Sequence, residues 1–301
     1  MSQASSLRAV LYALGANTGI LVAKGTAAAV TGSSAMLAEA IHSAADCGNQ
    51  VLLLFGMRDA RRPADERHPL GYGRAVYFWA FLVAVLLFTL GGLFSIYEGL
   101  HKLQAAEPMR SPGIAIAVLV VAVVLEGFSL AGCIREIRKV AGGRSLWKFF
   151  RTSRNSELIV VLGEDIAALA GLAFALVAVL VAVATGNPLY DALGSMAVGV
   201  LLVVVAVLLS IEIKSMIIGE SAESELREGI RAFLKDRPEI VETYNVLTFQ
   251  LGDGVMLAVK ARMRETGTAA ALIEAVNRVE ADLRQAFPAV QWCFFEPDNK
   301  N

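Results

Sequence analysis

Residues Leu158–Ala184 read LIVVLGEDIAALAGLAFALVAVLVAVA, and this stretch decides the fold. It is longer than the roughly 20 mostly apolar residues that a helix needs to cross a bilayer. It nevertheless contains two adjacent acidic residues, Glu164 and Asp165. An ionisable side chain inside a membrane segment costs about 2.5–3.5 kcal/mol on insertion scales, so it marks a functional site by default. The stretch therefore predicts a membrane helix that carries part of a site.

Five further segments are long and apolar enough to span a membrane. They are approximately Leu7–Val30, Ala35–Met57, Ala75–Tyr97, Gly113–Ile134 and Leu189–Ile218. The turns Thr31–Ser34 (TGSS) and Thr185–Pro188 (TGNP) have the residues of tight connections. Of the 301 residues, 56% are hydrophobic and 18% charged, whereas a soluble domain averages about 25% charged. We therefore expect an all-α six-helix transmembrane bundle over residues 1–218.

Basic residues are concentrated in two of the connections between these segments. They are Arg58, Arg61, Arg62, Arg67 and Arg74 in the second-to-third connection, and Arg135, Arg138, Lys139, Arg144, Lys148, Arg151 and Arg154 in the fourth-to-fifth. By the positive-inside rule these connections are cytoplasmic, and with six spans both termini are cytoplasmic too. In a bacterium the protein would lie in the inner membrane. The N-terminus lacks a clear cleavage site, so we expect no removable signal peptide.

The composition changes abruptly after Gly219-Glu220, where a polar C-terminal domain, residues 219–301, begins. Its pattern predicts a helix, two strands, a helix and a strand: Glu223–Asp236, Ile240–Leu251, Val255–Met263, Thr268–Phe287 and Val290–Phe295. Gly252-Asp253-Gly254 is a strong hairpin signal between the first two strands. This order favours a small sheet with helices on one face. So short a domain has a marginal core, which dimerisation could offset.

Two ionisable residues in Ala35–Met57 favour a metal site. His42 and Asp46 are one helical turn and about 40° apart on a helix, so they share a face. Zn²⁺ binds such nitrogen and oxygen ligands tetrahedrally, and two more ligands must come from a neighbouring helix. Asp165 supplies one, and Glu164 is a candidate for the other. A lone histidine in an apolar helix is more often an interhelical hydrogen-bonding group, but the accompanying carboxylates favour a metal site.

Other classes of protein receive little support from the sequence. The net charge is −1, which gives no basic excess for nucleic-acid binding. The three cysteines have no CxxC spacing, so the sequence supports neither a disulfide framework nor a zinc ribbon. There is no nucleophile constellation or phosphate-binding loop, so we do not expect an enzyme. The C-terminal domain contains no histidine, which argues against regulatory metal binding there.

The stretch ALGANTGILVAKGTAAAVTGSSAMLAEAIHSAADCGNQ (Ala13–Gln50) resembles the first two spans of the cation diffusion facilitator family, with its TGS turn followed by HxxxD. HPLGYGR (His68–Arg74), SIYEGL (Ser95–Leu100) and YDALGSMAVG (Tyr190–Gly199) agree with it. The resemblance implies a ferredoxin-like α+β cytoplasmic domain and a transport site formed by the second and fifth spans. It also implies a homodimer in the lipid bilayer that exchanges a divalent cation for protons.

One position departs from the family pattern. The fifth span of the family usually carries a second HxxxD, but four residues before Asp165 this chain has Val161, which cannot bind metal. The adjacent Glu164-Asp165 pair resembles a divergent branch that includes mitochondrial zinc carriers. Either Glu164 or a water would then be the fourth ligand. Zn²⁺ is the expected transported substrate, with Mn²⁺, Fe²⁺ or Co²⁺ as alternatives because carboxylate-rich sites suit harder ions.

Several alternatives stay open at this point. The first hypothesis is a proton-coupled metal exporter, and the rival, motivated by Val161, is a membrane interaction protein that no longer transports. Glu126 is either a functional residue, as a proton carrier or a residue that supports the metal ligands, or it only makes a polar contact between helices. We expect Asn17 to form hydrogen bonds between helices. His68 is expected in a turn, with a ligand role in a loop metal site as the alternative.

Overall fold

The computed structural model describes residues 2–31, 34–104 and 112–300. Proximity of Cα atoms divides the chain into two compact units. The first contains Met1–Arg58, Val76–Arg151 and Asn155–Lys214, and the second contains Asp59–Ala75, Thr152–Arg154 and Ser215–Asn301. Parts of both arginine-rich connections therefore group with the C-terminal residues rather than with the long helices.

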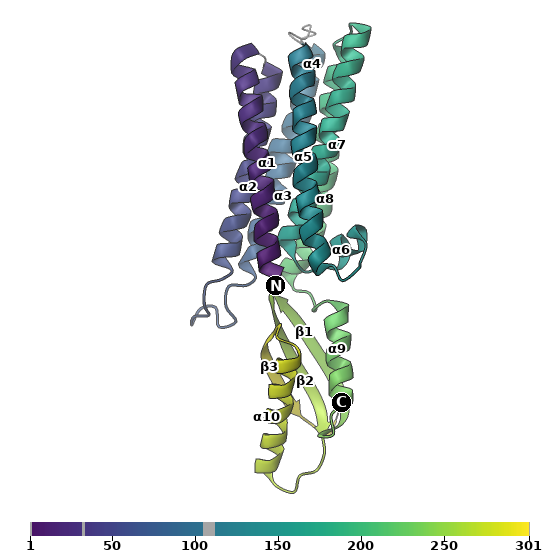
Figure 1. Ribbon diagram of the computed structural model, residues 1–301. Coiled ribbons are helices and arrows are strands. Elements are labelled where there is room, and N and C mark those ends of the chain that lie inside the picture. The colour runs from purple at the N-terminus through teal and green to yellow at the C-terminus, as the bar shows by residue number, and fades with distance from the viewer. Residues whose placement is uncertain (1, 32–33, 105–111, 301) are drawn as a thin grey trace. The chain divides into compact units, whose positions relative to one another are not determined.

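The long helices of the first unit run side by side (Figure 1). They are α1 (Ser2–Thr31), α2 (Ser34–Asp59), α3 (Ala75–Leu86), the π-helix η1 (Leu87–Leu93), α4 (Phe94–Gln104), α5 (Pro112–Val140), α7 (Ser156–Thr185) and α8 (Leu189–Ile218), with a short α6 (Leu146–Thr152) before α7. Segments α3, η1 and α4 follow one another without a break, so they form one continuous helical stretch. The predicted helical bundle is confirmed, and its two unpredicted features are η1 and α6.

Four of the described helical stretches are long and apolar enough to cross a membrane. They are Ala75–Gln104, Pro112–Val140, Ser156–Thr185 and Leu189–Ile218. Helices α1 and α2, with 30 and 26 residues, are also long enough, but each buries polar side chains, including Asn17 and Lys24 in α1 and Asn49 and Gln50 in α2. These polar residues lower the mean hydropathy of both helices. That α1 and α2 cross the membrane remains a prediction from the sequence.

The helices pack through small and aliphatic side chains. Helix α1 lies along α5, and α5 lies along α7. Their shared core contains Ile20, Leu119, Ala122, Leu172 and Val179. The outward faces carry large apolar side chains, such as Phe128 (71% exposed) and Val22 (62%). Apolar surface on the outside of a helical bundle is what contact with lipid requires, because lipid is as apolar as the bundle interior.

Glycines bring α8 unusually close to the stretch that contains η1 and α4. A Cβ atom at Gly99 would lie 2.9 Å from the carbonyl oxygen of Ala192, and one at Gly199 would lie 2.8 Å from the carbonyl oxygen of Gly92. Only residues without a side chain permit this backbone approach. Lys102 and Asp191 add an ion pair of 3.2 Å between α4 and α8. This packing fixes the position of η1, whose first residue, Leu87, lines the cavity described below.

In the second unit, two helices cover one face of a three-stranded sheet. Its elements are α9 (Ser224–Lys235), β1 (Ile240–Leu251), β2 (Gly254–Met263), α10 (Ala269–Ala286) and β3 (Val290–Pro297). The strand order is β1-β2-β3, with β1 antiparallel and β3 parallel to β2. Ile230 and Val279, from the two helices, share one core with Leu257 of the sheet. The predicted α+β order is confirmed, and the hairpin turns at Gly252 with a φ of 67°.

Within this unit, the segment Asp59–Ala75 lies against the β1–β2 hairpin. A Cβ atom at Gly73 would lie 2.2 Å from the carbonyl oxygen of Leu251, so backbone meets backbone here. The Arg74 guanidinium lies 5.2 Å from the centre of the Phe249 ring. These contacts hold the connection that follows α2 against the sheet. Arg154, from the other connection, forms an ion pair of 2.7 Å with Glu220.

Candidate metal site

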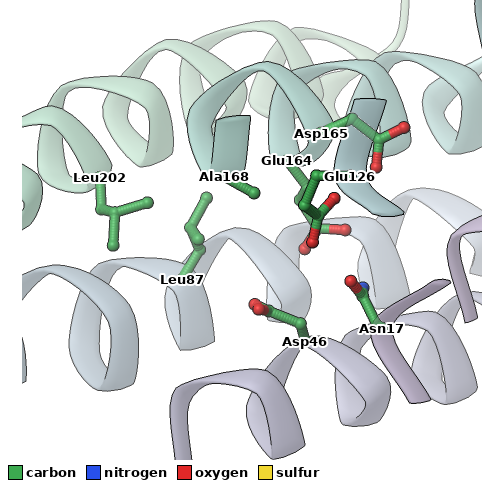
Figure 2. A pocket seen from close by; sticks show the side chains of 8 residues that line it. All are labelled: Asn17, Asp46, Leu87, Glu126, Glu164, Asp165, Ala168 and Leu202. Carbon is green, nitrogen blue, oxygen red and sulfur yellow. The ribbon is translucent and has the colours of Figure 1, made fainter. Parts of the chain in front are cut away.

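A small cavity in the first unit is lined by side chains from α1, α2, η1, α5, α7 and α8. The lining residues are Asn17, Asp46, Leu87, Glu126, Glu164, Asp165, Ala168 and Leu202. Figure 2 shows Leu87, Ala168 and Leu202 grouped at one end, whereas Asn17 and the carboxylates of Glu126, Glu164 and Asp165 lie toward the other. The cavity volume of about 10 Å³ is close to the ~10–15 Å³ that one water molecule needs. Its size therefore suits a single water or ion.

Helix α7 contributes both of its adjacent acidic residues to this cavity. Glu164 and Asp165 are only 8% and 2% exposed. The hydroxyl of Ser129 on α5 lies 3.2 Å from each carboxylate oxygen of Asp165, to which it donates. Consecutive residues on a helix point about 100° apart, so the two carboxylates reach the cavity from different directions. Asp165 consequently turns toward α5.

Glu164 is held by two side-chain amides of α2. Asn49 Nδ2 donates to its Oε1 at 2.9 Å, and Gln50 Nε2 donates to its Oε2 at 3.0 Å. Gln50 accepts a hydrogen bond in turn from Asn17 Nδ2 at 3.2 Å. A buried network therefore connects α1, α2 and α7 beside the cavity. The prediction that Asn17 forms hydrogen bonds between helices is confirmed.

Helix α2 places Asp46 on the cavity wall, where it is half-buried. The backbone of His42 belongs to the same helix one turn earlier, and its side chain lies outside the described part of the chain. Among the described side chains, no three histidine, cysteine, aspartate or glutamate residues are grouped closely enough to hold a metal ion. The described carboxylates thus surround the cavity without meeting at one point.

Two further buried residues bear on the chemistry of the site, one by lacking a ligand atom and the other by its charge. Val161 is fully buried in α7, and its aliphatic side chain can offer no ligand at the position four residues before Asp165. Lys24 of α1 is only 4% exposed and interacts electrostatically with Glu126 of α5. This interaction was not anticipated from the sequence.

The sequence reasoning also missed Asn49, Gln50 and Ser129. A signal for the two amides was present, because Asn49 and Gln50 lie three and four residues after Asp46 and so share its helix face. Polar side chains on that face of an apolar helix are expected to contact another helix. Ser129 carried a weaker signal, because serine can also satisfy its hydroxyl within its own helix.

His68 lies in a turn that Asp65 organises. Asp65 Oδ1 accepts hydrogen bonds from the backbone N–H groups of His68 at 2.7 Å and Arg67 at 3.0 Å, and its Oδ2 accepts one from the Tyr72 hydroxyl at 2.6 Å. The hydrogen bond from Tyr72 is the main reason that the pKa of Asp65 is lower than its usual value. These contacts agree with the expected turn and use Asp65 to stabilise it.

Comparison with known proteins agrees with this architecture. Residues 10–218 match the cation efflux transmembrane domain. Metal tolerance protein C4 of Arabidopsis thaliana is 32% identical over 251 residues, which cover 83% of this chain and 55% of that protein. The mitochondrial proton-coupled zinc antiporter SLC30A9 of Homo sapiens is 34% identical over 226 residues, covering 74% of this chain and 40% of that protein. The chain therefore spans about half the length of these two relatives.

A bacterial relative matches over more of its length. Zinc transporter ZitB of Escherichia coli is 23% identical over 300 residues, which cover 97% of this chain and 89% of that protein. The four apolar helical stretches and the transmembrane-domain match together identify an integral membrane protein. The chain belongs to the cation diffusion facilitator family.

Proposed function

We propose that this protein is a proton-coupled exporter of a divalent metal cation, with Zn²⁺ as the expected substrate. The observation that carries the proposal is the cavity lined by Asp46, Glu164 and Asp165 inside the helical bundle. Relatives named as zinc transporters and as a proton-coupled zinc antiporter support it. Their names support transport rather than catalysis as the class of activity.

Electrostatics gives the physical reason for a dication at this place. A carboxylate removed from water is strongly disfavoured unless a charge or hydrogen bonds compensate for its lost hydration. Several carboxylates around one water-sized cavity also repel one another. A dication bound among Asp46, Glu164 and Asp165 would compensate for both effects at once. Buried acidic groups in membrane segments are typical of ion and proton pathways for this reason.

The proposed ligands are His42, Asp46 and Asp165, with Glu164 or a water in the fourth place. The amides of Asn49 and Gln50 hold the Glu164 carboxylate, as outer hydrogen-bonding partners commonly orient metal ligands. Each carboxylate oxygen keeps a lone pair for a metal, because it accepts a single hydrogen bond from these amides. A donor set with one imidazole and several carboxylates also suits Mn²⁺, Fe²⁺ or Co²⁺, which are the alternative substrates.

Proton coupling follows from competition at the ligands. Metal binds only to deprotonated ligands, so its binding releases protons. Protons that enter from the other side of the membrane would then neutralise the carboxylates, protonate the imidazole of His42 and expel the metal. Rocking of the helices would expose the site to each side in turn. Exchange therefore requires no chemistry beyond protonation and a change of access.

The arrangement in the membrane is part of the same proposal. The arginine-rich connections predict that both termini are cytoplasmic, and in a bacterium the protein would lie in the inner membrane. We propose that residues 1–218 form the transmembrane domain, and that residues 219–301 form a cytoplasmic domain that dimerises. The C-terminal domain has a small hydrophobic core, which is consistent with stabilisation by a second copy of the chain.

Zinc flux in proteoliposomes tests this function. The purified full-length protein is reconstituted, and zinc uptake is followed by a trapped fluorescent indicator, with and without an acidic lumen. We expect an acidic lumen to accelerate zinc uptake, and zinc entry to be accompanied by proton exit. Uptake that is indifferent to the pH gradient would contradict proton coupling. Absence of both uptake and zinc-dependent proton release would favour the membrane interaction protein that does not transport.

A further inference from the structure

We propose that Glu126 of α5 is a ligand of the transported dication, so that three helices rather than two bind the ion. The inference rests on the proposed function, because it concerns the same cavity. It assigns to Glu126 the coordination place that Val161 leaves empty on α7. It also predicts that Glu126 sets the preference between zinc and harder dications.

The position of Glu126 is the first argument. Its side chain lines the cavity together with Asp46 and Asp165, and it is only 4% exposed. Figure 2 shows its carboxylate, like that of Glu164, at the polar end of the cavity. Ser129, one turn further along α5, reaches Asp165. The face of α5 that carries Glu126 is therefore turned toward the proposed metal ligands.

The unequal hydrogen bonding of the buried carboxylates is the second argument. Glu164 accepts two hydrogen bonds from side-chain amides, and Asp165 accepts the hydroxyl of Ser129. Within the residues that the structure describes, no hydrogen bond to the Glu126 carboxylate is found. Its interactions are electrostatic, with the neighbouring carboxylates of Asp46, Glu164 and Asp165 and with Lys24. A buried carboxylate without a hydrogen bond needs a cation to compensate for its lost hydration. Compared with Glu164 and Asp165, Glu126 therefore has more coordination capacity left.

The chemistry of the donors gives the third argument. Carboxylate oxygens favour hard ions such as Mn²⁺, whereas imidazole suits zinc. With Glu126 as a ligand, the proposed donors are the carboxylates of Asp46, Asp165 and Glu126 together with the single imidazole of His42. Because these carboxylates surround the cavity without converging in this structure, an ion must draw them inward. The flexible side chain of a glutamate can make that movement.

The competing explanation is that Glu126 only balances the charge of Lys24. Both explanations predict that Glu126→Gln weakens metal binding, so the test needs further variants. Glu126→His keeps a metal ligand but removes the negative charge. The double variant Lys24→Met/Glu126→Gln removes both members of the charge pair. Glu136→Gln is the matched control, because Glu136 lies on the same helix, is 1% exposed and pairs with Lys139 rather than lining the cavity.

Calorimetric titration of the purified full-length protein with ZnCl₂ and with MnCl₂ provides the readout, with Asp165→Asn as the reference for a lost ligand. We expect Glu126→Gln to weaken binding of both metals by about 10-fold or more, the range seen when groups that support a metal are removed. Manganese should lose more than zinc. Glu126→His should recover affinity for zinc but not for manganese. The double variant should still bind both metals weakly. Glu136→Gln should bind both metals like the wild type.

Three results would overturn the inference about Glu126, and a fourth would overturn the proposed function itself. Wild-type binding by Glu126→Gln, with binding lost in Asp165→Asn, would remove Glu126 from the site and leave the proposed function intact. Equal behaviour of Glu126→His and Glu126→Gln, or full recovery in the double variant, would assign Glu126 to charge balance with Lys24. Wild-type binding by Asp165→Asn would instead contradict the proposed function itself.

Discussion

Gln50 on α2 donates a hydrogen bond of 3.0 Å to the carboxylate of Glu164 on α7. Both side chains are buried, at 0% and 8% exposure. The bond joins the helix that carries Asp46 to the helix that carries Asp165. A change in the separation of α2 and α7 must therefore break or stretch this contact, so it bears on stability and on metal binding together.

Replacement of Gln50 by alanine should destabilise the protein. Glu164 would lose one of its two amide donors, and leaving a buried acceptor unsatisfied costs about 1–3 kcal/mol. Denaturant titration of the purified protein in detergent measures this free energy of unfolding. Thr26→Val is the control, because the Thr26 hydroxyl is exposed and bonds within its own helix to Val22. Equal stability of Gln50→Ala and Thr26→Val would contradict the buried contact.

Replacement of Ser129 by alanine should weaken zinc binding without preventing folding. The Ser129 hydroxyl orients the Asp165 carboxylate, and removal of such outer partners typically costs 10–100-fold in metal affinity or activity. Ser129→Thr retains a hydroxyl and should recover most of the affinity. Calorimetric titration with zinc measures both variants. Unchanged affinity in Ser129→Ala would show that Asp165 needs no support from α5.

The turn around His68 should loosen in acid. Hydrogen bonds from the Tyr72 hydroxyl and the His68 N–H lower the pKa of Asp65 below its usual value of 3.8. A lowered folded-state pKa contributes stability that is present above about pH 4 and is lost as the pH falls through the folded value. Hydrogen exchange of the Arg67 and His68 amides measures this, compared with Asp65→Asn at each pH. The wild type should exchange more slowly at about pH 6, and the difference should shrink progressively as the pH falls below the usual pKa of 3.8.

Two results would contradict the role of the ionised Asp65 carboxylate in this turn. One is a difference in exchange rate between the wild type and Asp65→Asn that persists in strong acid, and the other is the absence of such a difference near neutral pH. Because both proteins are compared at the same pH, the intrinsic pH dependence of amide exchange cancels. The comparison therefore isolates the contribution of one carboxylate.

Cys293 should be nearly inert toward thiol reagents in the folded protein. Burial in the sheet core raises its pKa to about 11, so at about pH 8 only about one thiol in a thousand is the reactive thiolate. Labelling with a chromogenic disulfide measures this in a Cys47→Ala/Cys133→Ala background. Addition of denaturant should restore ordinary reactivity. Fast stoichiometric labelling of the folded protein would contradict the burial of Cys293.

Much of the fold follows from local sequence patterns. The predicted bounds of Leu189–Ile218 and Ile240–Leu251 coincide with α8 and β1, because apolar length and turn residues define both. The π-helix Leu87–Leu93 was not predicted, since its apolar residues fit an α-helix equally well. In the structure its Gly92 packs closely against α8. The helix α6 was missed because seven residues show too little periodicity.

The candidate site was predictable only in part. Asp46, Glu164 and Asp165 stood out as charges in apolar segments, and the structure brings them to one cavity. Which neighbours hold them depends on the rotation of each helix about its axis, which no single sequence reveals. The sequence therefore left the role of Glu126 open and did not show that Gln50 contacts Glu164. The electrostatic relationship between Lys24 and Glu126 likewise requires α1 and α5 to be seen together.

Zinc uptake by Asp165→Asn proteoliposomes tests the central claim most directly. The substitution keeps the size of the side chain but removes the charge that the dication needs. The control is Asp191→Asn, which changes a membrane-helix aspartate that pairs with Lys102 outside the cavity. Under an acidic lumen we predict background uptake for Asp165→Asn and near wild-type uptake for Asp191→Asn. Wild-type uptake by Asp165→Asn would show that the buried cavity is not the transport site.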